Sequence, residues 1–354
     1  MEYGSDPRIL VINPGSTSTK VALFRGENLE ESASLPVPPM GDEWGLWDEF
    51  LPRLEGIREW MGKEGIDVGD LSATVGRGGL LRAVEGGTYR ITEPMLTDAR
   101  ENRQGAHASN LGCALAQAVS EGIPSFIVDP VSTDEFGDLA RYSGLREIPR
   151  TSLSHALSIH ALVREVCRRE GKRLEESRFV VAHLGGGISV CPVDGGRILD
   201  ANNANSGGPF SPTRAGGLPT QELLSLCYAG KHTLGEMRER TVKQGGLMSY
   251  LGTGNAEEVE ERIRGGDGEA RMVYEAMAYQ IAKEIGAMTT VLKGDVERIL
   301  LTGGLASSEL LMGWIRERVG FLAPVEIWPT VEEMKALALG ALRVLRGEAQ
   351  AKEY

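Results

Sequence analysis

Short apolar runs alternate with loops of small residues at the start of the chain. Residues 9–12 and 21–24 each predict a buried strand, and the turn signal at 26–28 predicts a third strand after them. The residues between the first two runs, 13–20, are mostly small and hydroxyl-bearing. From 44 to 64 apolar residues recur at helical spacing, which predicts a surface helix carrying Leu46, Phe50, Leu54, Ile57 and Met61 on one face.

Strands and helices alternate along the rest of the chain. We expect strands at 73–75, 125–128, 179–182, 188–191, 197–200 and 298–301. We expect helices at 101–119, locally broken near Gly105 and Gly112, and at 153–167, 271–292, 307–319 and 331–345. This alternation predicts the α/β class with mixed or parallel sheets. The order strand, small-residue loop, strand, turn, strand occurs over 8–30 and again over 179–200, which indicates two distantly duplicated domains.

Composition then narrows the class of protein. The 354 residues suit about two domains at roughly 150 residues each, and 41% hydrophobic with 25% charged residues is an ordinary globular mixture. The net charge of −12 argues against a general binder of nucleic acid or of anionic membranes, which needs a basic surface. Four cysteines without a CxxC pair predict reduced thiols rather than a disulfide framework or a zinc site.

We also expect no membrane segment. No apolar run reaches the roughly 18 residues of a membrane-spanning helix, and the N-terminal residues lack the pattern of a signal peptide. Together with the cysteine usage, this predicts a cytoplasmic protein.

Glycine is unusually frequent, at 46 of 354 residues, and it clusters in loops that follow apolar runs. The loop that ends at Lys20 offers backbone N–H groups, hydroxyls and an ammonium, which bind phosphate, but it lacks the second glycine of a Walker A motif. The segment 183–187 places three consecutive glycines between two strands, and 302–304 precedes a helix whose N-terminus favours an anion. Each loop alone also fits a turn or a bulge. Three of them, two in duplicated halves, favour phosphates bound from both domains across a cleft.

Charged side chains lie on or beside these loops. Arg77 stands among glycines at 76–79 and Arg214 in the segment SPTRAGG, so each suits bidentate binding of a carboxylate or phosphoryl group, although an exposed arginine is more often simply solvated. Asp129 follows an apolar strand and suits either a Mg²⁺ site or a turn. Glu332 and Glu333 lie in the first turn of the last helix, where carboxylates favour the helix dipole in any case. The five histidines lack the spacing of a metal site.

The order of these loops resembles that of the acetate and sugar kinase, Hsp70 and actin superfamily, and within it the short-chain fatty-acid kinases. The motifs are VINPGSTSTK at 11–20, GRGGLLR at 76–82, EGGTY at 85–89, HASNLG at 107–112, VDP at 128–130, VAHLGGGIS at 181–189, TRAGG at 213–217 and LTGGL at 301–305. The resemblance implies an α/β fold of two duplicated ribonuclease-H-like domains, 1–150 with the C-terminal helix at 331–354 and 151–330, about a central cleft. It also implies a homodimer or a higher homo-oligomer.

The activity that the resemblance implies is phosphorylation of a short-chain fatty acid, butanoate + ATP ⇌ butanoyl phosphate + ADP, with Mg²⁺. On the nucleotide side it implies two sets of residues. Those at the first phosphate loop are Asn13, Ser16, Ser18 and Lys20. Those at the nucleotide phosphates and adenosine are His183, Gly185, Gly186, Gly187, Gly303 and Gly304.

On the acid side, the resemblance implies that Arg77 and Arg214 hold the carboxylate and the transferring phosphoryl group. It places His107 beside the acyl pocket, and it assigns Asp129 and Glu332 to the metal.

Two features depart from the acetate-kinase pattern. In the glycine-rich loop, Gly186 stands where acetate kinases place Asn. Acetate kinases carry Phe-His-Gly-Thr-Ser-His where this chain has residues 150–155, so their first, functional histidine falls on Thr151. Only the second histidine is retained, as His155, which we take as a candidate catalytic residue. Both departures argue against a strict acetate kinase and fit the branch of the family that acts on butanoate.

The implied chemistry agrees with the residue inventory, and two alternatives stay open. A carboxylate is already a nucleophile at pH 7, so transfer depends on in-line positioning and charge stabilisation rather than on a strong general base. Each buried methylene contributes only about 0.8 kcal/mol, so propanoate, isobutanoate or acetate are alternative acids. Outside this class the alternative is an ATP or polyphosphate hydrolase, or a chaperone-like ATPase of the same superfamily.

Overall fold

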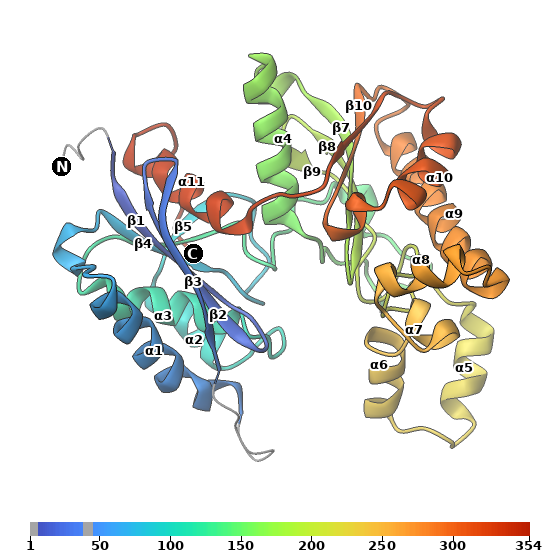
Figure 1. Ribbon diagram of the computed structural model, residues 1–354, viewed down its shortest axis with the longest axis horizontal. Coiled ribbons are helices and arrows are strands. Elements are labelled where there is room, and N and C mark those ends of the chain that lie inside the picture. The colour runs from blue at the N-terminus through green and yellow to red at the C-terminus, as the bar shows by residue number, and fades with distance from the viewer. Residues whose placement is uncertain (1–5, 38–44) are drawn as a thin grey trace. The chain divides into compact units, whose positions relative to one another are not determined.

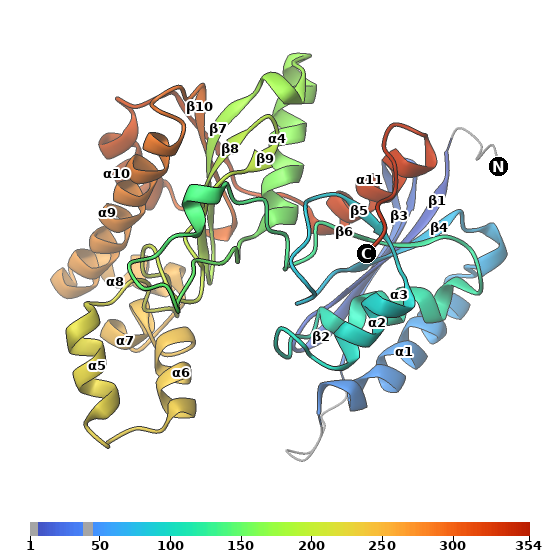
Figure 2. The same ribbon diagram turned by 180° about the vertical axis from the view of Figure 1, so that it is seen from behind.

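The computed structural model of the protein describes residues 6–37 and 45–354 (Figure 1). By packing, the chain divides into two compact units. Unit 1 comprises Met1–Asp134, Ala156–Ser158 and Glu332–Tyr354, and unit 2 comprises Glu135–His155 and Ile159–Val331. The view from behind shows that each unit has its own sheet and helices (Figure 2). The domain ranges expected from the sequence, 1–150 with 331–354 and 151–330, stay a prediction.

Unit 1 is built on a six-stranded mixed sheet. Its strands are β1 (Arg8–Pro14), β2 (Ser18–Arg25), β3 (Asn28–Pro36), β4 (Ala73–Arg77), β5 (Thr88–Arg90) and β6 (Ser125–Val128). They lie in the order β3-β2-β1-β4-β6-β5. The first three strands pair antiparallel, whereas β4 and β6 continue the sheet parallel to β1. The apolar runs at 9–12 and 21–24 therefore form neighbouring strands, and the loop between them lies at one end of the sheet.

Helices cover both faces of this sheet. α1 (Phe50–Lys63), α2 (Glu93–Arg100) and α3 (Asn110–Ser120) lie on one side, and α11 (Glu333–Leu345) lies on the other (Figure 1). Leu10 and Ile12 are fully buried in a cluster with residues of α1 and α3. Because side chains alternate along a strand, Ile9 and Val11 face the opposite side, where α11 packs on β1, β4 and β6. Residue 44, where the helix was expected to begin, lies outside the described residues, and α1 covers most of the rest of the expected range.

Unit 2 is built on a five-stranded mixed sheet. Its strands are β7 (Arg178–Leu184), β8 (Ile188–Asp194), β9 (Arg197–Ile198), β10 (Arg298–Thr302) and β11 (Val325–Trp328), in the order β11-β10-β7-β8-β9. α4 (Ala156–Glu170) lies on one side of this sheet, and α9 (Gly268–Val291) and α10 (Glu309–Val319) lie on the other (Figure 1). Four further helices connect β9 to α9: α5 (Thr220–Tyr228), α6 (Leu234–Val242), α7 (Gly246–Leu251) and α8 (Ala256–Arg264).

The two sheets share one topology, which confirms the predicted duplication. In unit 2, β7, β8 and β9 pair antiparallel in sequence, and β10 and β11 then extend the sheet parallel to β7. β1, β2, β3, β4 and β6 of unit 1 are connected in the same way. The β1–β2 loop and the β7–β8 loop are therefore equivalent, and Asn13 stands in β1 where His183 stands in β7.

The helix predicted over 101–119 is right in its break near Gly105, but it is wrong in its start at residue 101 and in its break at Gly112. The chain forms α2 at Glu93–Arg100 and then turns, and α3 begins only at Asn110. Gly112 lies inside α3 instead of interrupting it. Glu93 and Pro94 form the first turn of α2, where proline is favoured because its missing N–H would be unpaired anyway. The helix predicted from residue 153 also begins later, at Ala156.

Gly112 is required by packing rather than by backbone conformation. A Cβ at Gly112 would overlap the backbone oxygen of Arg77, and a Cβ at Gly76 would overlap the backbone of Gly112. α3 and β4 therefore approach each other backbone to backbone. This contact lies at the end of β4 that carries Arg77.

We expect Gly112→Ala to lower the free energy of unfolding by about 3 kcal/mol, because overpacking against backbone atoms cannot be relieved by a side-chain rotation. Gly56→Ala is the matched control, since Gly56 also lies in a helix but has no atom within 4 Å of the added Cβ. That variant gains about 0.5–1 kcal/mol from its better helix propensity. Denaturant unfolding of both variants measures the difference, and equal stabilities would contradict the packing argument.

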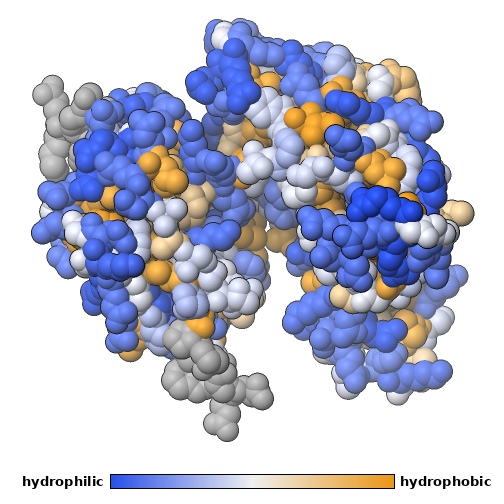
Figure 3. All heavy atoms as spheres, in the orientation of Figure 1, coloured by the Kyte–Doolittle hydropathy of each residue, from blue (hydrophilic) through white to orange (hydrophobic). Residues whose placement is uncertain are grey.

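Polar side chains cover most of the viewed face of each unit (Figure 3). Among residues 6–37 and 45–354, no helix combines the length and apolar character needed to cross a bilayer.

Candidate active site

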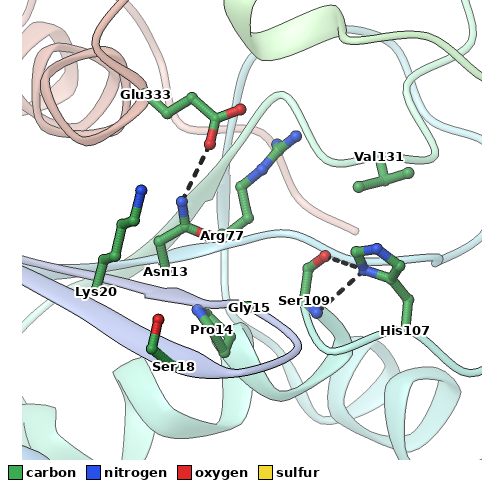
Figure 4. Close-up of a pocket in the computed structure, with 10 residues that line it drawn as sticks. All are labelled: Asn13, Pro14, Gly15, Ser18, Lys20, Arg77, His107, Ser109, Val131 and Glu333. Atoms are coloured by element: carbon green, nitrogen blue, oxygen red, sulfur yellow. Dashed lines mark hydrogen bonds between the residues drawn. The ribbon is translucent and has the colours of Figure 1, made fainter. Parts of the chain in front are cut away.

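The loop between β1 and β2 borders a pocket of about 280 Å³ in unit 1 (Figure 4). The residues that line it are Asn13, Pro14, Gly15, Ser18, Lys20, Arg77, His107, Ser109, Val131 and Glu333. They come from the ends of β1, β2 and β4, from the segments before α3 and after β6, and from the start of α11. Five residues that the sequence analysis assigned to the site therefore meet here: Asn13, Ser18, Lys20, Arg77 and His107.

The carboxylate that lines the pocket at the start of α11 is that of Glu333, not that of its neighbour Glu332. Glu333 accepts a hydrogen bond from the Asn13 side-chain amide at 3.2 Å, and Figure 4 shows the pair beside the Lys20 ammonium. Glu332, which was expected at the metal, is the exposed N-cap residue of α11 and does not line the pocket. Ser16 is likewise exposed and outside the lining, at the tip of the loop.

Arg77 ends β4 as a buried cation, only 8% exposed. Its Nη1 donates a hydrogen bond to the backbone oxygen of Asp129 at 3.0 Å. Burial lowers the pKa of the guanidinium, while the charges of Glu333 and Asp129 act in the opposite direction. An arginine keeps its proton in such surroundings, so Arg77 brings a fixed positive charge to the pocket.

Asp129 is held at the end of β6 in an unusual conformation. Its carboxylate accepts a hydrogen bond from the Gly87 N–H at 2.7 Å, and its own N–H donates to the Gly87 oxygen at 2.9 Å. Its φ is +39°, in the left-handed region that few residues other than glycine adopt. Strained backbone of this kind concentrates at functional sites. The side chain does not line the pocket itself.

His107 lines the side of the pocket opposite Lys20 (Figure 4). Its Nδ1 accepts a hydrogen bond from the Ser109 N–H at 3.2 Å and makes a further, short contact with the Ser109 hydroxyl. Because Nδ1 accepts from the backbone, the neutral ring carries its proton on Nε2.

In unit 2, the glycine loop between β7 and β8 lies against the segment that carries Arg214. The Gly185 N–H donates to the Gly187 oxygen at 3.1 Å, and the Ser211 hydroxyl donates to the Gly186 oxygen at 2.5 Å. A Cβ at Gly187 would overlap the guanidinium of Arg214. The third glycine therefore lets the arginine side chain cross directly over the loop.

Arg214 is held by few contacts of its own. Its Nη1 donates to the Ala204 oxygen at 3.0 Å, and its backbone N–H donates to the Ser211 hydroxyl at 3.1 Å. Burial lowers the pKa of its guanidinium. A partly buried cation with donors to spare is suited to an anion.

Two histidines stack beside this loop. The rings of His155 and His183 lie 4.0 Å apart between centroids and within 10° of parallel, and Nδ1 of His155 lies 2.9 Å from the Ser189 hydroxyl. His155 is the N-cap residue of α4. His183 lies near the end of β7, and Ser189 is the residue of β8 that pairs with it. Thr151, the position of the missing acetate-kinase histidine, is exposed.

The third glycine loop follows β10. Gly303 has φ +90°, and a Cβ there would overlap the backbone of Leu184, so this glycine allows β10 to end against β7. The loop leads into a 3₁₀ turn at Gly304–Ser307, and α10 begins only at Glu309 behind its N-cap Ser308. The helix expected at 307–319 is therefore present but begins two residues later than predicted. The Thr302 hydroxyl is buried with no hydrogen-bond partner within the described part of the chain.

The structure thus groups the candidate residues by unit. Unit 1 holds the pocket with Arg77, and unit 2 holds the stacked histidines, the glycine loops and Arg214.

Two contacts in unit 2 were not predicted from the sequence. Ser211 had a local signal, since a hydroxyl three residues before an arginine can accept its N–H, whereas nothing local linked Ser189 to His155.

Comparison with solved structures shows the class to which this fold belongs. The crystal structure of Porphyromonas gingivalis acetate kinase matches with a TM-score of 0.79 at 18% identity, covering 96% of this chain and 100% of that chain. Entamoeba histolytica acetate kinase matches with a TM-score of 0.78 at 15% identity, covering 94% and 98%. The fold is therefore that of the acetate kinases.

Sequence comparison narrows the class to a family. The acetokinase family profile matches residues 150–318. A protein named probable butyrate kinase 2 from Caldanaerobacter subterraneus is 50% identical over 98% of this chain and 99% of its own. A probable butyrate kinase from Listeria monocytogenes is 46% identical over the same shares. The chain therefore belongs to the butyrate kinase branch of the acetokinase family. This confirms the predicted family and the predicted class of enzyme, a phosphotransferase that uses ATP or ADP and a carboxyl acceptor.

Proposed function

We propose that the protein transfers the terminal phosphoryl group of ATP to the carboxylate of butanoate. The observation that carries the proposal is the pocket of unit 1, which combines the buried cation of Arg77 with the amide of Asn13 and the ammonium of Lys20. Pro14 and Val131 add apolar surface to the same pocket. This combination suits a small acid whose carboxylate binds a guanidinium and whose alkyl chain leaves water.

In this proposal Arg77 orients the carboxylate, and His107 borders the acyl chain. The acid needs no base to become a nucleophile, because its carboxylate is ionised at neutral pH. One carboxylate oxygen attacks the γ-phosphorus, the bond from that phosphorus to the bridging oxygen breaks, and ADP leaves. The protein's part is to align the attacking and leaving oxygens.

We assign the nucleotide to the loops of unit 2 together with the first phosphate loop of unit 1. Gly185, Gly186 and Gly187 would present backbone to the phosphates, and Gly303 and Gly304 would lie at the adenosine. His183 would donate to a phosphate oxygen, with His155 stacked on it and held by Ser189. Arg214 would stabilise charge on the transferring phosphoryl group, which is the largest single contribution that a site of this kind makes.

Mg²⁺ is expected with the nucleotide, and the residues present fit it. Among the described residues, no group of three or more His, Cys, Asp or Glu is placed to hold a metal alone. Mg²⁺ is usually held by one or two carboxylates together with substrate phosphates and water. Asp129 and Glu333, whose charges act on Arg77, would supply those carboxylates. When bound, the ion neutralises charge on the β- and γ-phosphates.

The test is an acyl-phosphate assay in which hydroxylamine traps the product, run with Mg·ATP and straight or branched acids of two to five carbons. We expect product with acids of three to five carbons and most of it with butanoate. A parallel assay for ADP in the absence of acid separates the alternatives. ADP formed at the same rate without any acid would replace this function by that of a hydrolase. The homo-oligomeric state and the cytoplasmic location stay predictions.

A further inference from the structure

A buried arginine on α1 contacts both ends of the first phosphate loop. Arg53 is 3% exposed, and its guanidinium donates from Nη2 to the Gly15 oxygen at 2.7 Å. Its Nη1 donates to the Thr19 hydroxyl at 2.8 Å and to the Ser18 oxygen at 3.3 Å. One planar group thus joins the residue that opens the loop to the residues that close it.

These contacts determine which backbone groups the loop presents outward. The carbonyl oxygens of Gly15 and Ser18 are taken by Arg53, and the Gly15 N–H also donates to Ser18 at 2.8 Å. The Thr17 oxygen accepts from the Val37 N–H at 3.1 Å. Within the described residues, the N–H groups of Ser16 and Thr17 have no hydrogen-bond partner. The loop therefore turns its carbonyls inward and leaves amides for an anion.

The surroundings of Arg53 explain why the residue is an arginine. Its charge is balanced by Glu49, one turn earlier on the chain, at 2.9 Å from Nε and 2.5 Å from Nη2. Five donors in a rigid plane reach Glu49, Gly15 and Thr19 at once, which a lysine with a single ammonium cannot do. A buried ion pair with this many hydrogen bonds specifies one geometry rather than adding much stability.

We propose that Arg53 is a positioning residue that holds the first phosphate loop with its amides directed at the terminal phosphates of ATP. This rests on the proposed function, because it assumes that this loop binds the nucleotide. Arg53 does not line the pocket itself, but its guanidinium contacts the backbone oxygens of two residues that do, Gly15 and Ser18. Its effect passes entirely through the backbone of residues 15–19.

Arg53→Lys keeps the positive charge but removes the planar guanidinium with its five donors. We expect it to lower kcat by about 100-fold, the loss that follows a misplacement of roughly 1 Å, and to raise KM for ATP. KM for butanoate should rise less than KM for ATP, because Arg77, which orients the carboxylate in the proposed function, lies on β4 and not on this loop. Faster amide hydrogen exchange across residues 13–20 should accompany the change. Arg58→Lys is the matched control, since Arg58 is exposed on the same helix and makes only a 3.4 Å contact with Ala118.

A second variant covers the case in which Arg53→Lys does not fold. Thr19→Val removes one acceptor of the guanidinium and keeps the shape of a residue that is 1% exposed. It should shift KM for ATP and loop exchange in the same direction by a smaller factor. If wild type makes no acyl phosphate, the proposed function fails while loop exchange still tests Arg53. If exchange and KM for ATP match wild type in both variants, or if both KM values rise together, Arg53 has no positioning role.

Discussion

Replacing Arg214 by alanine is expected to lower kcat at least about 100-fold, the loss that follows removal of one donor to developing charge. The guanidinium crosses Gly187 and donates to the Ala204 oxygen, and within the described part of the chain no carboxylate pairs with it. Its remaining donors are therefore available for a phosphoryl group. Steady-state kinetics with saturating ATP and butanoate measure the effect.

The fold should tolerate this change. Arg214→Ala removes one side-chain hydrogen bond to a backbone oxygen, a loss of about 1 kcal/mol, so the thermal midpoint should move by only a few degrees. Arg238→Ala is the control, because Arg238 is an exposed arginine of α6 in the same unit. Turnover near that of the control would remove Arg214 from the site.

Arg77→Lys should reduce kcat/KM for butanoate by about 10- to 100-fold, because a lysine replaces two charge-assisted hydrogen bonds worth about 1.5–3 kcal/mol each by one. We choose lysine rather than the uncharged methionine as the replacement, because lysine keeps a positive charge at this position. Removing the cation would leave Asp129 and Glu333 without their buried counter-charge and would lower stability by about 3–5 kcal/mol. Initial rates over a range of butanoate concentrations give the value.

The same variant separates the acid from the nucleotide. KM for ATP should change less than KM for butanoate, because all of the proposed nucleotide loops except the first phosphate loop lie in unit 2. Arg100→Lys, on the exposed side of α2, should leave both constants unchanged. A rise in KM for ATP without one for butanoate would assign Arg77 to the nucleotide instead.

Much of the framework could be predicted because its signals are local. The apolar runs around 13–20 and 183–187 identified both hairpins, and the glycines there mark places where another group crosses the backbone. Gly187 illustrates this, since the crossing group is Arg214, 27 residues further along the chain. The helix at Glu93–Arg100 also had a local signal, the proline in its first turn, which the apolar spacing of the segment obscured.

Other features could not be predicted because they depend on distant partners. Glu332 and Glu333 are neighbours in the sequence, but successive residues of a helix start point in different directions, so only the packing of α11 decides which carboxylate reaches Asn13. Arg53 resembled any charged residue on a surface helix, and its role follows from acceptors more than 30 residues earlier.

α11 is near the C-terminus of the chain but packs on the sheet formed by the N-terminal strands, and this affects folding during synthesis. Leu337, Ala338 and Ala341 of this helix are fully buried, and the helix packs on strands made from the first 130 residues. At roughly 5–20 residues per second, translation of the intervening unit takes tens of seconds. During that time the nascent N-terminal sheet exposes Ile9 and Val11 on an uncovered face, so unit 2 can finish folding on the ribosome before unit 1 does.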